Sequence, residues 1–408
     1  MRLKMAQIYD FIYNLFPYLG AWLRGLLQSW GLPEDAILLI IGLIKAFLLA
    51  NFGLIGFAIL TYVERKIVAR FQDRLGPNVA GPYGILQPVA DGIKLLTKED
   101  TMPAGADRWV YNLAPLIIAT CALAPLVVIP FGPGAVGADL NIGVLYALAV
   151  GAGALVGVLM AGWGSNNKYA LLGAFRAVAQ LISYEIPAVF SVVVVVMVAG
   201  TMSTVGIVLA QDVPYLFVLP LAALVFLISG VAEVGRTPFD LLEAESEIVA
   251  GFHIEYSGMK FALVFLGEFI HALVVSALFA VLFLGGWRGP WLPPYLWTLI
   301  KMSVGIFLFF WLRATLPRIR IDQMLNLNWK FLTPLMILNL IGVALVDKGL
   351  RAAGATGGLW AAGMFAFNMA MLIGALGIPG YLGHRARMAA MASASGEEPE
   401  ALEAVGAH

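Results

Sequence analysis

The chain has 408 residues, of which 61% are hydrophobic and only 12% are charged, and its mean hydropathy is +0.88. Soluble domains carry about 25% charged residues, so this composition excludes an ordinary soluble protein. Lys and Arg together number 25, as do Asp and Glu, and the net charge of zero gives no reason to expect nucleic acid as a partner. The single cysteine, Cys121, excludes a disulfide framework, a CxxC redox pair and a four-cysteine iron–sulfur site. The composition predicts a helical protein that crosses a membrane several times.

The apolar stretches of the chain predict where it crosses the membrane. About 20 apolar residues suffice to span the hydrocarbon core as a helix, and continuous apolar runs favour helices over barrel strands, which alternate. The fold predicted is all-α: a polytopic integral membrane protein with about nine transmembrane helices and additional interfacial amphipathic helices. The expected spans are residues 36–61, 112–131, 142–162, 177–199, 214–233, 259–284, 293–312, 331–347 and 358–380.

The positions of Lys and Arg predict the orientation of these spans, because both residues are enriched in cytoplasmic loops. They concentrate in the loop at 63–110 and in the later loops on the same side, whereas the loops on the opposite side carry Arg288, Lys348 and Arg351. Arg2, Lys4 and Arg24, before the first span, argue weakly for the reverse orientation. We therefore expect the long loops, including an acidic one at 234–258, to be cytoplasmic and the N-terminus to lie outside.

The two ends of the chain differ from the membrane domain expected at 36–384. Residues 1–35 mix apolar and aromatic side chains with few charges, which is typical of a helix lying in the membrane interface. A cleaved signal peptide is the less favoured alternative, because no small-residue cleavage motif follows a short apolar core. Residues 385–408, rich in Ala, Ser and Glu, are expected to form a disordered tail.

The first long loop is dense in charged residues, Gly and Pro. Its charged start at 64–66 is followed by two Gly-Pro pairs within 76–82, and such pairs mark turns. Apolar residues at helical spacing then predict an amphipathic helix over 83–97. Arginines that simply anchor the first span at the interface are the alternative interpretation.

Acidic residues gather between residues 180 and 270. Glu185 and Glu268 lie inside predicted spans, where a carboxylate costs at least ~2.5 kcal/mol. Asp240, Glu243 and Glu247 recur at spacings of three and four, which places three carboxylates on one helical face. Crowded, desolvated carboxyl groups exchange protons near neutral pH, as a proton path requires. A solvated acidic loop, the alternative, would not explain the two spans that carry glutamate. The full set is Glu185, Asp212, Glu233, Asp240, Glu243, Glu245, Glu247, Glu255 and Glu268, against only Arg236 and Lys260.

Other polar or motif-like residues carry weaker signals. Lys45 and Lys301 each lie well inside a span; snorkelling toward the interface is the simpler interpretation, and a polar route that continues outward is the other. The glycines at 151–157 have the spacing of a dinucleotide loop but lie inside a span, which indicates helix packing. His271 has no histidine in another span with which it could hold haem. We find no redox centre, so the electrons must come from a partner.

A series of motifs between residues 36 and 347 identifies the family that the chain resembles. They are ERK at 64–66, QxRxGPNxxGPxG at 72–84, LQPxAD at 86–91, GWxSNNKY at 162–169, SYE at 183–185, TPFD at 237–240, EAESE at 243–247, GFHIEYSG at 251–258 and RAxLPRxRxDQ at 313–323. In this order they resemble NuoH, the H subunit of NADH-quinone oxidoreductase, which is respiratory complex I.

The resemblance implies the heel of the membrane arm, where quinone enters from the bilayer and reaches toward the terminal iron–sulfur cluster of the peripheral arm. It implies a quinone-binding side formed by Arg65, Arg74, Asp91, Arg236, Asp240 and Glu243. It implies a proton and coupling path formed by Glu185, Glu233, Glu245, Glu247, Glu255 and Glu268, to which Lys45 and Lys301 would add.

The function implied is that of a membrane subunit, with no flavin, haem or iron–sulfur cluster of its own, in a proton-translocating enzyme of the bacterial inner membrane. Its substrate would be ubiquinone or menaquinone. Its partners would be the lipid bilayer, the quinone-module and iron–sulfur subunits of the peripheral arm, small membrane subunits and antiporter-like subunits. Three alternatives stay open: the same subunit in a complex fed by ferredoxin, deazaflavin or hydrogenase, a stand-alone cation/proton antiporter, and a scaffold without a site.

Overall fold

The computed structural model describes residues 13–242 and 249–395, and it describes side chains up to residue 377. Within these residues the fold is all-helical, as predicted, apart from one isolated β-bridge between Gly132 and Ala135. Eight helices in the described part are long and apolar enough to cross a membrane. They are α3 (Glu34–Phe71), α5 with η2 (Arg108–Leu123, Ala124–Val128), α6 with α7 (Gly143–Ala152, Ala154–Gly164), α8 (Lys168–Ala199), α13 (Gly258–Phe283), α14 (Pro294–Thr315), α15 with η4 and α16 (Ile321–Leu327, Asn328–Leu332, Thr333–Ala352) and α17 (Gly357–Ser395).

The span expected at 214–233 is divided in two. It consists of α10 (Tyr215–Val218) and α11 (Pro220–Glu233), which are separated by Leu219 at φ −127° and ψ 55°. Pro220 has no N–H to continue the ladder and drives the preceding residue out of helical conformation. A short helix α9 (Thr204–Ala210) precedes this segment.

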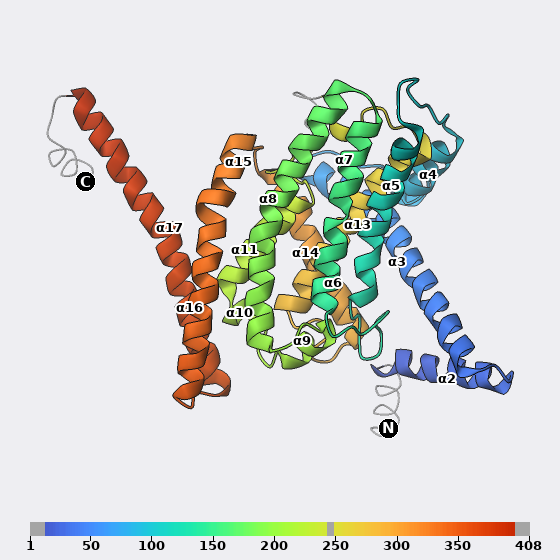
Figure 1. Cartoon of the computed structure of the whole chain (residues 1–408), viewed down its shortest axis with the longest axis horizontal. Helices are drawn as coiled ribbons and strands as arrows, with labels where there is room; N and C mark the ends of the chain where they lie inside the picture. Colours follow the sequence, from blue (N-terminus) through green and yellow to red (C-terminus); the bar gives the residue numbers. More distant parts are fainter. Residues whose placement is uncertain (1–12, 243–248, 396–408) are drawn as a thin grey trace.

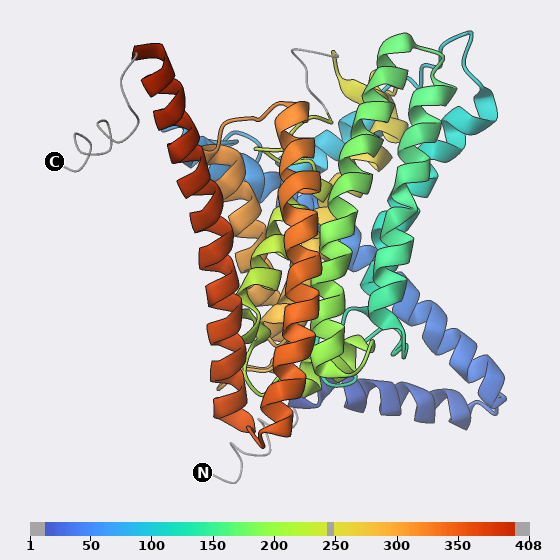
Figure 2. The same cartoon turned by 60° about the vertical axis from the view of Figure 1, so that its left-hand side comes forward.

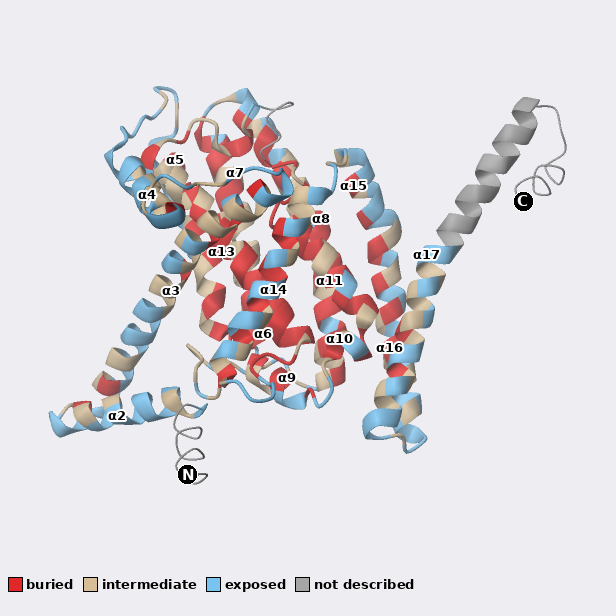
Figure 3. Ribbon diagram, turned by 180° about the vertical axis from the view of Figure 1, so that it is seen from behind, coloured by how far each residue is buried: buried red, intermediate tan, exposed pale blue. Residues whose placement is uncertain are grey.

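Helix α13 lies at the centre of the bundle, packed against α5, α11 and α14 (Figure 1). In its most apolar stretch, 83% of the residues are buried (Figure 3). A helix that is apolar on all sides belongs in an interior, which explains this position. The few polar residues of α13, among them Glu268 and His271, are thereby held inside the protein.

The outer helices leave much of their surface exposed. Helix α2 (Leu15–Ser29) meets the start of α3 at a steep angle, and Arg24 pairs there with Glu34 at 2.9 Å (Figure 2). At the opposite side, α16 and α17 pack on each other. The side chain of Asn368, fully buried in α17, accepts a hydrogen bond from Asn339 and donates to the carbonyl of Val218. Helix α17 continues to Ser395 and so enters the segment expected to be a disordered tail, whose remainder, 396–408, lies outside the described residues.

The first long loop begins later than expected. Helix α3 continues to Phe71, so the charged residues 64–66 lie on its last turns. The turn η1 (Pro82–Gly84) and the helix α4 (Gln87–Thr97) follow, so the helix predicted over 83–97 starts at 87. Gly84 has φ +81°, and a Cβ there would lie 2.2 Å from the carbonyl oxygen of Pro77. Only glycine fits this close approach, which folds the loop back on itself.

Candidate functional site

A charged pocket lies where the end of α3 meets the loop at 72–79, Thr237 and the end of α14. Its volume is about 780 Å³, and Arg65 and Arg74 line it. Arg65 also pairs with Asp91 of α4 at 2.7 Å, which ties α4 to the rim of the pocket. The structure thus gathers three of the residues assigned to the quinone-binding side, Arg65, Arg74 and Asp91.

Glu64 is the anion that holds the base of this charged pocket together. Its Oε1 lies 3.1 Å from Nη1 of Arg236, and Arg313 of α14 pairs with the same oxygen. Glu64 and Arg236 are each 6% exposed, and the Arg236 guanidinium lies 4.7 Å from the ring centre of Phe269. Glu64 and Arg313 were missed as site residues although both belong to recognised motifs, because spacing along a sequence does not reveal a pair between distant helices.

Buried Gln180 of α8 fixes the turn that carries Arg236. Its Nε2 donates to the carbonyl of Ala232 at 2.7 Å and to that of Phe239 at 2.8 Å. These two carbonyls flank Arg236, so one side chain closes the loop around it. Asp240 directly follows Phe239 and is only partly exposed. Glu243, expected on the quinone-binding side, lies outside the described residues, as do Glu245 and Glu247 of the expected coupling path.

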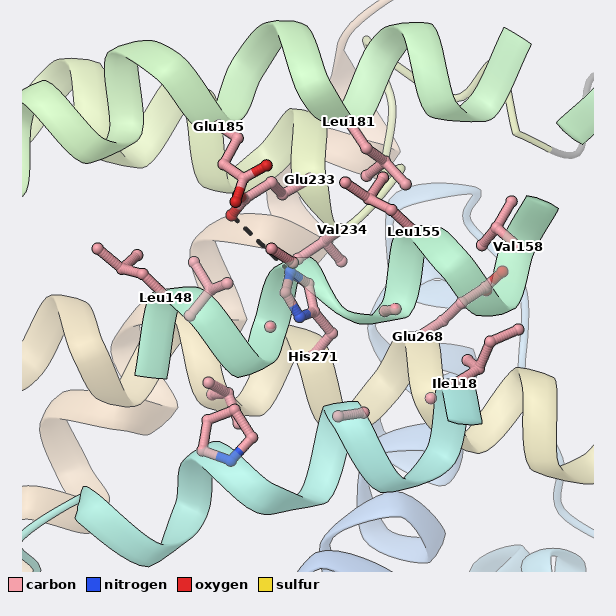
Figure 4. A pocket seen from close by; sticks show the side chains of 18 of the residues that line it. Ile118, Leu148, Leu155, Val158, Leu181, Glu185, Glu233, Val234, Glu268 and His271 are labelled. Carbon is pink, nitrogen blue, oxygen red and sulfur yellow. Dashed lines mark ion pairs between the residues drawn. The ribbon is translucent and has the colours of Figure 1, made fainter. Parts of the chain in front are cut away.

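A second site, the acidic cavity, lies inside the bundle between α5, α6, α7, α8, α11 and α13 (Figure 4). Its lining is mostly apolar, and its ionisable groups are Glu185 of α8, Glu233 of α11, and Glu268 and His271 of α13. Its volume of about 110 Å³ is large enough for several water molecules. The structure therefore brings together the three glutamates that the sequence placed within or at the end of spans.

His271 adds a nitrogen base to the acidic cavity. Its Nε2 lies 3.8 Å from Oε2 of Glu233, and Glu185 interacts electrostatically with both residues (Figure 4). Two carboxyl groups and an imidazole share one largely apolar chamber, where the charge of one group acts on the others with little screening. From the sequence alone, His271 was considered only as a haem ligand. Its place beside Glu268 in the cavity could have been predicted from the spacing of three residues, which puts both side chains on one helical face.

Glu255 lies outside the lining of the acidic cavity, at a junction of three loops. Its Oε1 accepts a hydrogen bond from Asn167 at 2.6 Å, and its backbone carbonyl accepts one from Tyr111 at 2.8 Å. The Tyr111 ring stacks on Tyr256 with centroids 4.2 Å apart. These contacts join the segment of Glu255 to the start of α5 and to the loop before α8.

Lys45 and Lys301 lie away from the acidic cavity. The Lys301 ammonium donates to the carbonyls of Leu284, Gly286 and Arg288, which follow the end of α13, at 2.6–2.8 Å. Lys45 donates to the carbonyls of residues 136 and 137. Both side chains bind loop carbonyls, and the structure does not connect either to the glutamates.

His253 lies within the acidic loop at 234–258, outside the membrane spans, on the turn η3 (Gly251–His253). Its ring lies against those of Phe252 and Phe261, at 5.2 and 5.6 Å between centroids. Its Nδ1 has no hydrogen-bond partner among the described residues. Burial lowers the pKa of His253 to about 4, because the charged imidazolium would lose its hydration.

No group of three or more His, Cys, Asp or Glu side chains that could hold a metal ion occurs in the part of the chain that the structure describes. Its polar groups instead form a charged pocket at one end of the bundle and a carboxyl-lined cavity within it. The fold and these sites define a polytopic helical membrane protein that carries ionisable groups in its interior.

The particular family follows from comparison with known sequences. The profile of the family described as "NADH dehydrogenase" matches residues 44–344, and the chain belongs to this family. Proteins named as the H subunit of NADH-quinone oxidoreductase are similar to it: the one from Dehalococcoides mccartyi (strain CBDB1) is 52% identical over 73% of this chain and 85% of its own length. Those from Geobacter metallireducens and Geobacillus kaustophilus are 51% and 50% identical, over 72% and 71% of this chain and 94% and 90% of theirs. The resemblance to NuoH is confirmed.

Glu64→Ala is expected to destabilise the protein, because it leaves Arg236 and Arg313 near each other without their shared anion. Removing one partner of a buried ion pair costs about 3–5 kcal/mol. We expect a large fall in the midpoint temperature of thermal unfolding, measured on the detergent-solubilised complex. Glu34→Ala, on the same helix, removes an exposed pair with Arg24 and serves as the control, with no measurable change expected. Equal losses in the two variants would contradict the importance of the buried pair.

His253→Phe is expected to remove part of the loss of stability in acid. The unfolded state binds a proton at the ordinary histidine pKa of 6.5, whereas the folded state binds it only near 4, so this stability is complete above pH 6.5 and is lost as the pH falls toward 4. At pH 5 the loss amounts to about 2 kcal/mol relative to neutral pH. The measurement is the unfolding midpoint of the wild-type protein and the variant at pH 7.5 and pH 5. If the midpoint falls between the two pH values by as much in the variant as in the wild type, His253 does not contribute to the loss of stability in acid.

Proposed function

We propose that this chain is the subunit of a bacterial NADH-quinone oxidoreductase that helps to form the quinone-binding chamber and couples quinone reduction to proton translocation. The names of its relatives, which are subunits of NADH-quinone oxidoreductases, support both quinone as the substrate and membership of a multisubunit enzyme. The observation that carries the coupling is the turn after α11: Glu233 lines the acidic cavity, and Arg236, three residues later, pairs with Glu64 beneath the charged pocket.

The charged pocket suits the head group of a quinone. The head has two carbonyl oxygens that accept hydrogen bonds, and Arg65 and Arg74 line the pocket with donors. Reduction by two electrons adds negative charge to the head. An anion in this pocket competes with Glu64 for Arg236 and Arg313, because each guanidinium favours the nearer or less compensated negative charge.

A change at Arg236 reaches the acidic cavity over a short path. Gly235, at φ +68°, and Val234 separate Arg236 from Glu233, and the Arg236 guanidinium packs on Phe269, which is next to Glu268. Movement or altered charge at Arg236 therefore acts on two of the carboxyl groups that line the cavity. Since their protonation is interdependent with that of Glu185 and His271, one charge created in the pocket shifts protons among the group.

The proposed role requires particular surroundings. The chain would lie in the inner membrane with its long loops, and hence the charged pocket, on the cytoplasmic side and its N-terminus outside. Peripheral-arm subunits would cover the pocket and deliver the electrons, and antiporter-like membrane subunits would receive the proton shifts. The donor, whether NADH, ferredoxin, deazaflavin or hydrogen, is determined by the peripheral subunits.

Glu185→Gln and Glu233→Gln are each expected to lower quinone reduction coupled to proton translocation by at least about tenfold, because a neutral amide cannot take up or release the proton. Oxidation of NADH by an artificial acceptor, which bypasses the membrane, is expected to stay unchanged. The measurement is proton uptake into inverted membrane vesicles during turnover. Glu99→Gln, an exposed residue of the first loop, is the matched control. Wild-type translocation in both cavity variants would refute the proposal.

A further inference from the structure

Helix α8 has a missing hydrogen bond beside one of the acidic-cavity glutamates. Pro187 lies inside the helix and has no N–H, so the carbonyl of Ser183, one turn earlier, loses its helical partner. Ser183 is 5% exposed, and a buried carbonyl left without a donor is costly. Glu185 lies in the same turn, between these two residues. The geometry of this turn therefore depends on what replaces the missing donor.

Asn328 replaces it. Its Nδ2 donates to the carbonyl of Ser183, and the Asn328 side chain is completely buried. The next residue, Trp329, donates from its indole Nε1 to Ser183 Oγ at 3.2 Å. Tyr184 in turn donates from its hydroxyl to the carbonyl of Met324 at 3.1 Å. Three hydrogen bonds thus join the Ser183–Tyr184 turn to residues 324–329.

The backbone around Asn328 is adapted to this contact. Residues Asn328–Leu332 form a π-helical turn, η4, between α15 and α16. Such turns are rare, appear mostly as single turns inside α-helices and are frequent at functional sites. Here the wider turn begins at the residue that reaches Ser183. The π-helical turn and the hydrogen bond to Ser183 therefore share one residue, Asn328.

The segment that contains Asn328 also contacts the charged pocket. Ile319, just before α15, donates its backbone N–H to the carbonyl of Pro238 at 3.1 Å, two residues from Arg236. Arg313, at the end of α14, pairs with Glu64. The stretch from 313 to 329 therefore contacts the base of the pocket at one end and the Glu185 turn at the other.

We propose that Asn328 is a positioning residue for Glu185: by supplying the donor that Pro187 lacks, it fixes the turn of α8 that places this glutamate in the acidic cavity. The inference rests on the proposed function, in which Glu185 exchanges protons. The other ionisable groups that line the cavity are Glu233 of α11 and Glu268 and His271 of α13, and Glu185 interacts with Glu233 and His271. A small displacement of Glu185 therefore changes the proton affinity of the whole group.

The test is a double-mutant cycle in the intact membrane complex. Asn328→Leu keeps the γ-branched shape, adds volume and removes the donor, and the control below adds the same volume. We expect quinone turnover to fall by about fivefold or more, and its pH profile to shift by about half a unit or more, because the proton affinities of the group change. Pro187→Ala restores the N–H of residue 187, so α8 can satisfy Ser183 by itself. In the double variant Pro187→Ala/Asn328→Leu, turnover is expected to lie within about twofold of that of Pro187→Ala alone. Its pH profile is expected to match that of Pro187→Ala.

Asn368→Leu is the matched control. Asn368 is as fully buried as Asn328 and also donates to a backbone carbonyl, that of Val218, but it lies in α17, away from the acidic cavity. We expect this variant to lower the amount of assembled complex at most, with the pH profile of wild type. If Asn328→Leu prevents assembly, recovery of assembly in the Pro187→Ala background supports the proposal.

Three outcomes overturn the inference. The first is an Asn328→Leu complex with wild-type turnover and pH profile. The second is a loss of the same size in both backgrounds, whether in turnover or in assembly. The third is a shift of the pH profile by Asn368→Leu as large as that by Asn328→Leu. Failure of the proposed function is recognised separately, by wild-type translocation in Glu185→Gln and Glu233→Gln.

Discussion

The buried pairing of Glu64 with Arg236 and Arg313 is the interaction on which the rest of the structure depends. It joins the ends of α3, α11 and α14, three elements that approach one another from distant parts of the chain. Charges in an apolar bundle are stable only when they are compensated, so these three residues must be placed together for the helices to pack at all. The same requirement makes the site responsive. Any new anion nearby would compete with Glu64 for Arg236 and Arg313, and the ends of the three elements would respond to that competition.

Two helices that carry glutamates of the acidic cavity contain a defect caused by proline. Pro187 in α8 and Pro220 at the start of α11 each leave the backbone with a missing N–H, and buried side-chain amides donate to carbonyls near both. Glu185 lies beside the first defect, and Glu233 lies at the far end of the helix that follows the second. Regular helices would pack with less cost but would offer fewer places for specific polar contacts. The polar amides in the core are therefore part of the site's architecture.

The sequence alone predicted the helical class, most of the spans and the glutamates of the acidic cavity, because hydropathy and buried charge are local signals. It did not predict the partners. That Glu64 pairs with Arg236 and Arg313, that His271 faces Glu233 and that Glu255 joins loops instead of lining the cavity all depend on how helices distant in sequence are packed. The continuation of α3 through its charged end was also hidden, since a charged run looks the same in a loop as on the last turns of a helix. Lys301 illustrates the converse: its position within a span was evident, but its acceptors, the carbonyls after α13, were not.

The docking of α17 through Asn368 has a consequence for the break between α10 and α11. The family profile ends at residue 344, before α17, yet a residue of α17 binds the carbonyl of Val218 at the break between α10 and α11. A side chain of this outermost helix therefore reaches into the bundle and binds the backbone where a membrane span is interrupted. Removing α17 from this chain would take that donor away, so the helix at the edge contributes to the backbone order of a span nearer the centre.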